Sequence, residues 1–191
     1  SDWLEVQIRV DGNVYSERFE RGKVVRKLEK IGTCPESEHG STVTFKADGT
    51  IFEETVYDYD VLKQRLREMA FLTKGLKIIL RDEREDKQER VFHYEGGIKE
   101  FVQYLNKSKT PLYEDIIYCE GERDKILVEV AMQHNDSYNE SVYSFVNNIT
   151  TPEGGTHLAG FKSALTKTFN DYAKKNKLLK ENEASLAGED I

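Results

Sequence analysis

The stretch that decides the fold covers residues 147–165 and reads NNITTPEGGTHLAGFKSAL. A strand-like apolar run ends in two asparagines, and a Pro-Glu-Gly-Gly turn leads into an amphipathic helix that starts near His157. Gly154 and Gly155 can adopt backbone angles that are closed to other residues, and Thr156 is a residue type that caps helix N-termini. These features favour a strand-to-helix turn. An anion site is the second interpretation, because helix N-termini attract phosphate and carboxylate groups.

The helix after this turn is expected to run from His157 to about Lys174. Its apolar stripe has helical spacing and consists of Leu158, Phe161, Leu165, Phe169 and Tyr172. Lys162 directly follows Phe161, so we expect it to lie about 100° around the helix from the stripe and to face solvent. Six lysines and a single acid, Asp171, occur in residues 162–180. A solvated helix face explains this pattern, and a groove that touches phosphates explains it as well.

The composition limits the possible functions. The 191 residues are 38% hydrophobic and 33% charged, which indicates one large or two small globular domains. The net charge of −7 argues against a nucleic-acid binder that uses its whole surface, but it leaves room for a local basic groove. No apolar run approaches the length of a membrane span, and no signal peptide is recognised. Cys34 and Cys119 show no metal-ligand spacing, so we interpret them as reduced thiols of a cytosolic protein.

The first half of the chain predicts mainly antiparallel strands. Alternating residues 3–20 form a hairpin around Asp11-Gly12-Asn13, and two more strands are expected at 24–32 and 41–48. A helix over 57–75 ends at a glycine, and strands at 76–82 and 90–94 follow it. We therefore expect residues 1–94 to form one curled antiparallel sheet with a crossing helix.

The second half predicts a short helix over 98–107 and then a meander of three strands at 115–123, 125–133 and 140–149. Strands are grouped in each half with few helices, so the predicted fold class is α+β.

Catalytic motifs are lacking from the sequence. It contains no phosphate-binding P-loop, no nucleophile elbow, no H-E-x-x-H and no C-x-x-C motif. His93 and His134 lie in predicted strands, where a structural histidine is the simpler interpretation. His157 is better placed but has no neighbouring nucleophile, and Glu129 and Asp136 lack a second carboxylate at a useful spacing. No catalytic residue and no metal ligand is therefore expected.

Several long segments together carry a family resemblance. In chain order they are GSTVTFKADGTIF, QRLREMAFLTKG, LRDER, FHYEGGIKEFVQYLNKSKTPL, VEVAMQHND, SFVNNITTPEGGTHLAGFKSALTKTFNDYAKKNKLL and GEDI. The chain resembles the B subunits of bacterial type II DNA topoisomerases over essentially its whole length. This family includes the B subunits of DNA gyrase and of its paralogue, topoisomerase IV. The segments RLREMAFL and EGGTHLAGF favour gyrase.

The resemblance implies a division of the chain into parts of two domains. Residues 1–96 resemble the second half of a Bergerat-type (GHKL) ATPase sandwich, and residues 97–191 resemble the first part of a transducer domain with a left-handed βαβ crossover. The family's general base, metal-holding asparagine and glycine-rich lid do not occur in this sequence. The Gln-Thr-Lys loop that touches the γ-phosphate in the family does not occur either. We therefore expect an internal fragment that is inactive by itself.

The resemblance also implies a mechanism and partners. In the family, ATP and Mg²⁺ drive two B subunits to dimerise and trap a DNA segment. The segment passes through a break made by the A subunit, in a tetramer of two A and two B subunits in the bacterial cytoplasm. Decatenation by a topoisomerase IV is the alternative, and a non-enzymatic cytosolic α+β interaction module is a rival from another class.

Few functional residues carry over from the family. Ser41 matches a threonine on the floor of the adenine pocket, and Val43 points the same way along the strand. Val10 stands where relatives often have an arginine at the pocket rim, with Arg9 beside it. Lys162 matches a basic residue that faces the cavity through which DNA passes. The resemblance therefore implies nucleotide contacts at the first two positions and DNA contacts at Lys162, with two further lysines, Lys167 and Lys174, extending the same surface.

Overall fold

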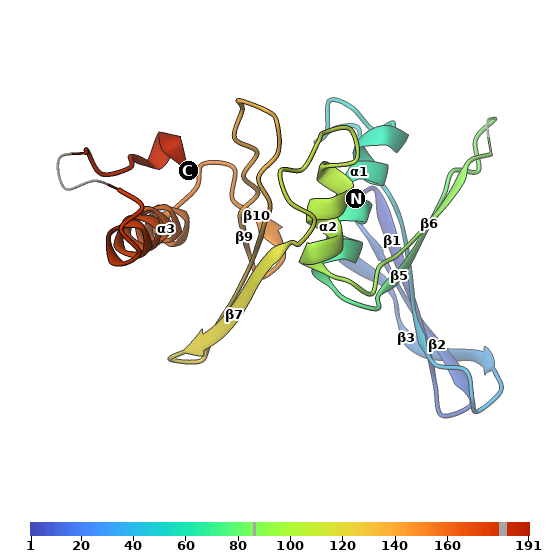
Figure 1. Cartoon of the computed structure of the whole chain (residues 1–191). Helices are drawn as coiled ribbons and strands as arrows, with labels where there is room; N and C mark the ends of the chain where they lie inside the picture. Colours follow the sequence, from blue (N-terminus) through green and yellow to red (C-terminus); the bar gives the residue numbers. More distant parts are fainter. Residues whose placement is uncertain (86, 180–182) are drawn as a thin grey trace. The chain divides into compact units, whose positions relative to one another are not determined.

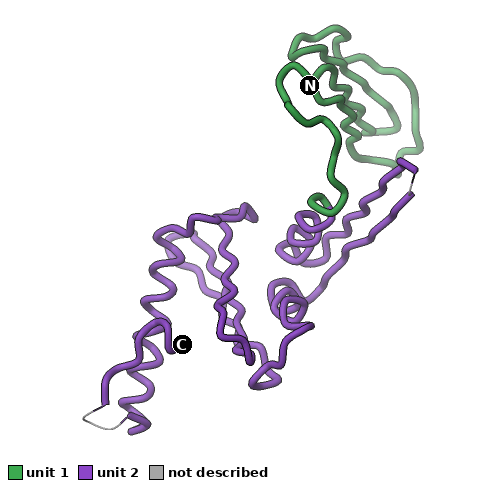
Figure 2. The backbone as a smooth tube through the Cα atoms, turned by 90° about the horizontal axis from the view of Figure 1, so that it is seen from above, with its two compact units in different colours: residues 1–62 green, residues 63–191 purple. Residues whose placement is uncertain are grey.

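The computed structural model describes residues 1–85, 87–179 and 183–191 (Figure 1). Two compact units divide the chain, residues 1–62 and residues 63–191 (Figure 2). Lys180, the last of the six lysines counted in the sequence, lies outside the described residues.

The first unit is built on a four-stranded antiparallel sheet with the strand order β3-β2-β1-β4. Its strands are β1 (Trp3–Val10), β2 (Asn13–Glu20), β3 (Lys23–Thr33) and β4 (Gly40–Lys46). The turn between β1 and β2 consists of Asp11 and Gly12, with φ of 48° and 71°. Positive φ at both central residues suits the twist of a two-residue hairpin. The predicted hairpin and the two further strands are therefore confirmed.

The second unit begins in α1 (Tyr59–Leu72) and continues through β5 (Lys77–Arg81) and β6 (Glu89–His93). Gly75, with φ of 77°, ends the helical region as predicted, and its N–H donates to the carbonyl of Tyr94. β5 and β6 pair only with each other among the described strands. The expectation of one sheet through residue 94 is therefore wrong, because alternation identifies a strand without identifying its partner.

Two hairpins follow α2 (Ile98–Leu105). The first is β7 (Ile117–Arg123) with β8 (Ile126–Met132), and the second is β9 (Phe145–Val146) with β10 (Ile149–Thr150). The expected three-stranded meander is wrong, because β9 pairs with β10 and not with β8. Every named pair is antiparallel, so the expected left-handed βαβ crossover is not formed among the described strands. It stays a prediction.

The decisive turn leads into α3 (Thr156–Lys175), and the 3₁₀ turn η1 (Gly188–Asp190) lies near the end of the chain. Gly154 and Gly155 have φ of 76° and 146°, as the turn interpretation requires. Gly155 occupies the N-cap position and no side chain caps the helix, so the cap expected from Thr156 is wrong. The inner side of α3 carries Ala173, at 7% exposure, in place of Tyr172, at 62%.

Aromatic side chains form the core of the second unit. Phe71 of α1 is 1% exposed and stacks on Tyr94, with ring centroids 3.6 Å apart. Phe101 of α2 lies 5.1 Å from the same ring, and Tyr104 lies 5.6 Å from it. This cluster ties α1 to α2 and to the segment after β6. Among the described residues, no helix is long and apolar enough to cross a membrane.

Candidate nucleotide and DNA surfaces

Ser41 and Val43 lie on one face of β4. Ser41 pairs with Ile8 of β1, and Val43 pairs with Val6. Residues two apart in a strand share a face, so the hydroxyl of Ser41 lies on the apolar side of the sheet, next to Val43 and Phe45. Both candidate residues are exposed, and Val43 is 56% exposed. This face can supply a hydroxyl and an apolar surface to a flat heterocycle.

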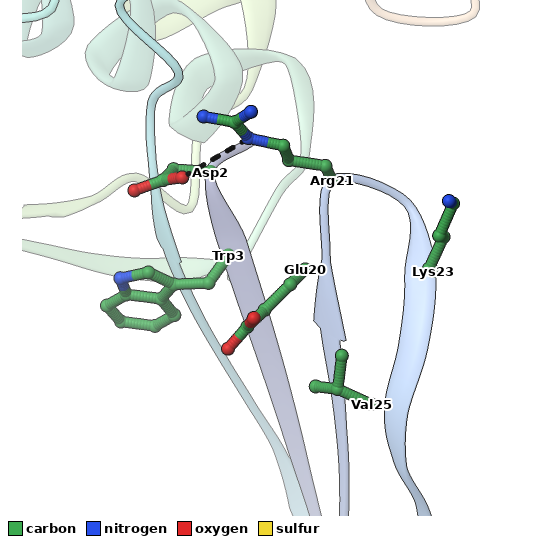
Figure 3. A pocket seen from close by; sticks show the side chains of 6 residues that line it. All are labelled: Asp2, Trp3, Glu20, Arg21, Lys23 and Val25. Carbon is green, nitrogen blue, oxygen red and sulfur yellow. Dashed lines mark ion pairs between the residues drawn. The ribbon is translucent and has the colours of Figure 1, made fainter.

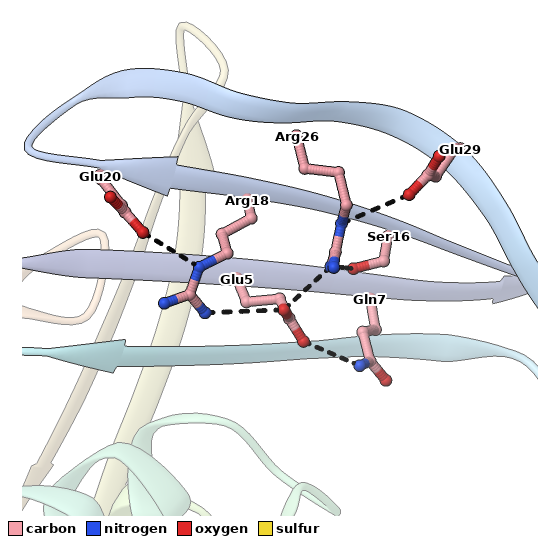
Figure 4. Close-up of polar contacts among 7 residues, drawn as sticks. All are labelled: Glu5, Gln7, Ser16, Arg18, Glu20, Arg26 and Glu29. Atoms are coloured by element: carbon pink, nitrogen blue, oxygen red, sulfur yellow. Dashed lines mark hydrogen bonds and ion pairs between the residues drawn. The ribbon is translucent and has the colours of Figure 1, made fainter.

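The opposite face of the sheet is polar (Figure 4). One guanidinium nitrogen of Arg26, Nη2, donates to Glu5 Oε2 at 2.9 Å and to Ser16 Oγ at 2.7 Å. The side-chain amide of Gln7 and then Arg26 lower the pKa of the Glu5 carboxyl by hydrogen bonding. The sheet therefore has two chemically different sides, and its charged groups are satisfied on the side away from Ser41.

Arg9 belongs to this polar side. Its Nη1 donates to Thr42 Oγ1 at 3.3 Å, and its Nε lies 3.9 Å from Glu38 Oε2. Val10 shares the side of Ile8 and is 40% exposed. Arg9 therefore does not replace the rim arginine of the relatives, because its side chain is directed to the other face.

An open pocket of about 510 Å³ lies at the start of the same sheet (Figure 3). It is lined by Asp2, Trp3, Glu20, Arg21, Lys23 and Val25. Arg21 Nε lies 3.7 Å from Asp2 Oδ1 and 3.8 Å from Asp48 Oδ2, so the cation of this pocket is already paired. Neither Ser41 nor Val43 lines it, so this pocket is separate from the candidate nucleotide surface.

Lys162 lies closer to the apolar side of α3 than expected. At 100° per residue it is within about 60° of Leu158, Leu165 and Phe169, all of which are half-buried. The expected separation of about 100° is therefore wrong, because Phe161 lies at the edge of the stripe and not at its centre. The Lys162 side chain is 46% exposed, which is typical of a lysine whose stem lies along apolar surface while its ammonium group reaches water.

Lys162 also has an ionic partner that the sequence did not indicate. Its Nζ donates to Oε1 of Glu140, in the segment between β8 and β9. Glu140 precedes Lys162 by 22 residues and is 58% exposed. No short-range pattern links two positions so far apart, so only the fold reveals this pair.

Lys167 and Lys174 occupy another sector of α3. Helical geometry places them about 20° apart, but about 120–140° from Lys162. Lys167 Nζ donates to Asp171 Oδ2 at 2.6 Å, which raises the pKa of Lys167 and lowers that of Asp171. The three lysines therefore do not form one continuous surface, and the structure brings together only Lys167 and Lys174.

His157 takes part in the turn before α3. Its Nε2 lies 3.3 Å from Thr151 Oγ1, which in turn lies 2.7 Å from Ser144 Oγ. These contacts join the start of the helix to both sides of the β9–β10 hairpin. The turn interpretation of this stretch accounts for the two glycines and for His157, and the anion site stays a prediction.

Sequence comparison identifies relatives that cover the whole chain. A family model described as DNA gyrase B matches residues 97–191. The DNA gyrase B subunit of Clostridium acetobutylicum is 56% identical over 192 residues, which cover 100% of this chain and 30% of that relative. The DNA topoisomerase 4 B subunit of Enterococcus faecalis is 53% identical and is covered to 28%. The chain thus spans about a third of the length of these curated relatives.

Solved structures share the fold. The 43K ATPase domain of Thermus thermophilus gyrase B, in complex with an aminocoumarin, has a TM-score of 0.83 and 36% identity. That match covers 99% of this chain and 51% of the solved one. The B subunit of Myxococcus xanthus DNA gyrase has a TM-score of 0.82 at 25% identity, covering 91% and 51%. The predicted α+β class and the predicted family are therefore confirmed, and the chain belongs to the DNA gyrase B family.

Proposed function

We propose that this chain acts as part of the B subunit of a bacterial DNA gyrase. In that subunit it couples ATP binding and hydrolysis to DNA strand passage and negative supercoiling. The observation that carries the proposal is the 56% identity to a gyrase B subunit over the whole chain. The likeness to the 43K ATPase domain of another gyrase B supports it further.

The proposal assigns the two parts of the chain different roles. Residues 1–96 form the second half of the ATPase domain, and residues 97–191 form the first part of the transducer. The family model supports this boundary, since its match starts at residue 97. ATP is the proposed nucleotide, and the hydroxyl of Ser41 and the apolar side chain of Val43 fit one wall of an adenine site. The described residues contain no cluster of side chains able to hold a metal ion, so the proposal assigns Mg²⁺ no ligand in this stretch.

DNA is the proposed substrate, and Lys162 is the proposed point of contact with its phosphates. A lysine is a mobile point charge suited to sequence-independent phosphate contact. Its exposure and the weak net energy of an exposed ion pair allow Lys162 to exchange Glu140 for a phosphate. Lys167 and Lys174 form a second, separate cationic patch. The proposed partners are the gyrase A subunit and a second B subunit, in the bacterial cytoplasm.

Topoisomerase IV is the second candidate, because the topoisomerase 4 B subunit of Enterococcus faecalis is 53% identical over the whole chain. The two enzymes differ in the reaction they favour, since only gyrase introduces negative supercoils.

The test uses the full-length B subunit carrying this sequence, combined in turn with the A subunits of a gyrase and of a topoisomerase IV. Relaxed plasmid and interlinked DNA circles serve as substrates with ATP. We expect ATP-dependent negative supercoiling with the gyrase partner. Efficient unlinking without supercoiling identifies a topoisomerase IV, and failure of both reactions with either partner contradicts the proposed function.

A further inference from the structure

Arg65 connects α1 to the hairpin that precedes α3. Its Nη1 donates to Thr150 Oγ1 at 2.8 Å, and its Nη2 donates to the backbone carbonyl of Asn148 at 3.0 Å. Nη1 also lies 3.1 Å from Glu68 Oε2, one turn further along α1. The carboxylate fixes the guanidinium on its own helix, so both terminal nitrogens are directed at the hairpin.

A second bond attaches the same turn to the end of α1. Asn148 Nδ2 donates to Thr73 Oγ1 at 3.2 Å. Asn147 and Asn148 have φ of 49° and 63°, which asparagine tolerates better than most residues. The Asn-Asn pair therefore permits the tight turn, and the side chain of Asn148 also holds it against α1.

The other end of this segment is attached to α3. The N–H of Thr151 donates to the carbonyl of Ser144 at 2.9 Å, and Thr151 Oγ1 lies 3.3 Å from His157 Nε2. The N–H of Gly154 donates to the carbonyl of Thr151 at 2.9 Å. Hydrogen bonds thus run from Arg65 through the hairpin to the first turn of α3, the helix that carries Lys162.

These contacts are informative because the chain before α3 is otherwise permissive. Gly154 and Gly155 lack a side chain that would restrict the direction of the helix, and no side chain caps its N-terminus. The direction of α3 therefore depends on how the 147–151 turn is held. A guanidinium reaches two acceptors at once in a fixed geometry, which an ammonium group does not reproduce.

We propose that Arg65 is a positioning residue that joins the ATPase and transducer segments and sets the direction of α3 for strand passage. The inference rests on the proposed function, because Arg65 lies in residues 1–96 and Thr150 lies in residues 97–191. When α1 shifts, the two bonds from Arg65 carry the shift to the turn and from there to Lys162. Loss of these bonds uncouples ATP hydrolysis from supercoiling without removing either activity's own residues.

The experiment measures negative supercoils introduced per ATP hydrolysed by the full-length subunit with its gyrase A partner. Arg65→Lys keeps the charge and loses the two-point contact, and Thr150→Val keeps the shape and loses the hydroxyl. We expect both variants to lower this ratio by roughly five-fold or more, the size of an ordinary coupling between sites, with KM for ATP unchanged. Thr150→Ser keeps a hydroxyl and should behave as the wild type. Arg90→Lys, on exposed β6, is the matched control for the arginine change.

The outcomes separate this inference from the proposed function. A wild-type ratio in both Arg65→Lys and Thr150→Val overturns the role of Arg65, even if Lys162→Glu abolishes supercoiling. An equal loss of ATP hydrolysis and supercoiling, with a lower melting temperature in Thr150→Val, shows that the contact only stabilises the fold and also overturns it. A wild-type subunit that hydrolyses ATP but never supercoils DNA contradicts the proposed function itself.

Discussion

Lys162 of α3 donates from Nζ to Glu140 Oε1, in the segment between β8 and β9. The two residues are far apart in the chain, and both side chains are about half exposed. A carboxylate and a DNA phosphate are both oxygen anions, so they compete for the same ammonium group. The ion pair gives Lys162 two possible roles, as a tie between α3 and the 133–144 segment or as a cation available to DNA.

Removing the charge of Glu140 should make Lys162 more available to DNA. Exposed ion pairs contribute about 0.2–1 kcal/mol, so Glu140→Gln is expected to tighten duplex binding up to about five-fold at low salt. Fluorescence anisotropy with a labelled duplex measures this change. Glu153→Gln alters the net charge equally in the turn before α3 and should have a smaller effect. Equal gains from both variants mean that only net charge matters.

Truncating Phe71 tests the aromatic core of the second unit. This ring is 1% exposed and contacts three other aromatic rings. Phe71→Ala should lower the free energy of unfolding by about 4 kcal/mol, from lost burial and an unfilled cavity, as measured by urea denaturation. Val61→Ala, at a position of α1 that is 65% exposed, should change it by less than about 0.5 kcal/mol. Similar small losses in both variants contradict the described core.

Asp48 gives the first unit a pH-dependent contribution to stability. Its carboxylate accepts bonds from the Thr50 hydroxyl at 2.6 Å and the Thr50 N–H at 2.9 Å, and Arg21 lies nearby. These contacts, with the hydroxyl first, lower the pKa of Asp48. A lowered pKa stabilises the fold above the unfolded value, near 4, and the contribution is lost as the pH falls through the folded pKa.

Asp48→Asn should therefore lower the urea midpoint most at neutral pH, and the difference from the wild type should shrink below about pH 4. Midpoints measured between pH 3 and pH 7 test this dependence. Glu53→Gln, at an exposed position close to Asp48, should show no comparable trend. A difference that stays constant over the whole range shows that the charge of Asp48 is not involved.

The 191-residue chain should not hydrolyse ATP by itself. Ser41 and Val43 offer only one wall of an adenine site, and phosphate and metal contacts normally supply much of the stabilisation in such sites. A steady-state assay with Mg²⁺ and purified chain is expected to show background turnover. Turnover that persists through purification and scales with the concentration of the chain would contradict this expectation.

Local sequence patterns predicted the elements better than their partners. Asp11-Gly12 indicated the first hairpin because the turn requires positive φ at both positions, and the structure has it there. The segment 140–149 alternates like a strand, yet only Phe145 and Val146 pair in its first part. Its earlier residues supply Glu140 to Lys162, and an alternating pattern carries no information on such a contact.

The surroundings of the candidate residues depended on long-range contacts. Arg65 and Thr150 are 85 residues apart, so nothing in the neighbourhood of either residue indicates the bond between them. The position of Lys162 on α3 was misjudged because it was measured from Phe161 alone. The centre of the stripe is visible only from the buried residues Asn170 and Ala173 further along the helix.

The central claim is that Lys162 serves DNA passage and not only the fold. The most direct measurement is ATP-dependent supercoiling by the full-length enzyme over a series of salt concentrations. It compares the wild type, Lys162→Glu and the swapped pair Lys162→Glu with Glu140→Lys. The swap restores an ion pair between α3 and the 133–144 segment while position 162 stays negative. The account predicts that both variants lose supercoiling, more so as ionic strength rises, and that ATP binding persists. Full recovery of supercoiling in the swapped pair, or wild-type supercoiling by Lys162→Glu at every salt concentration, would contradict it.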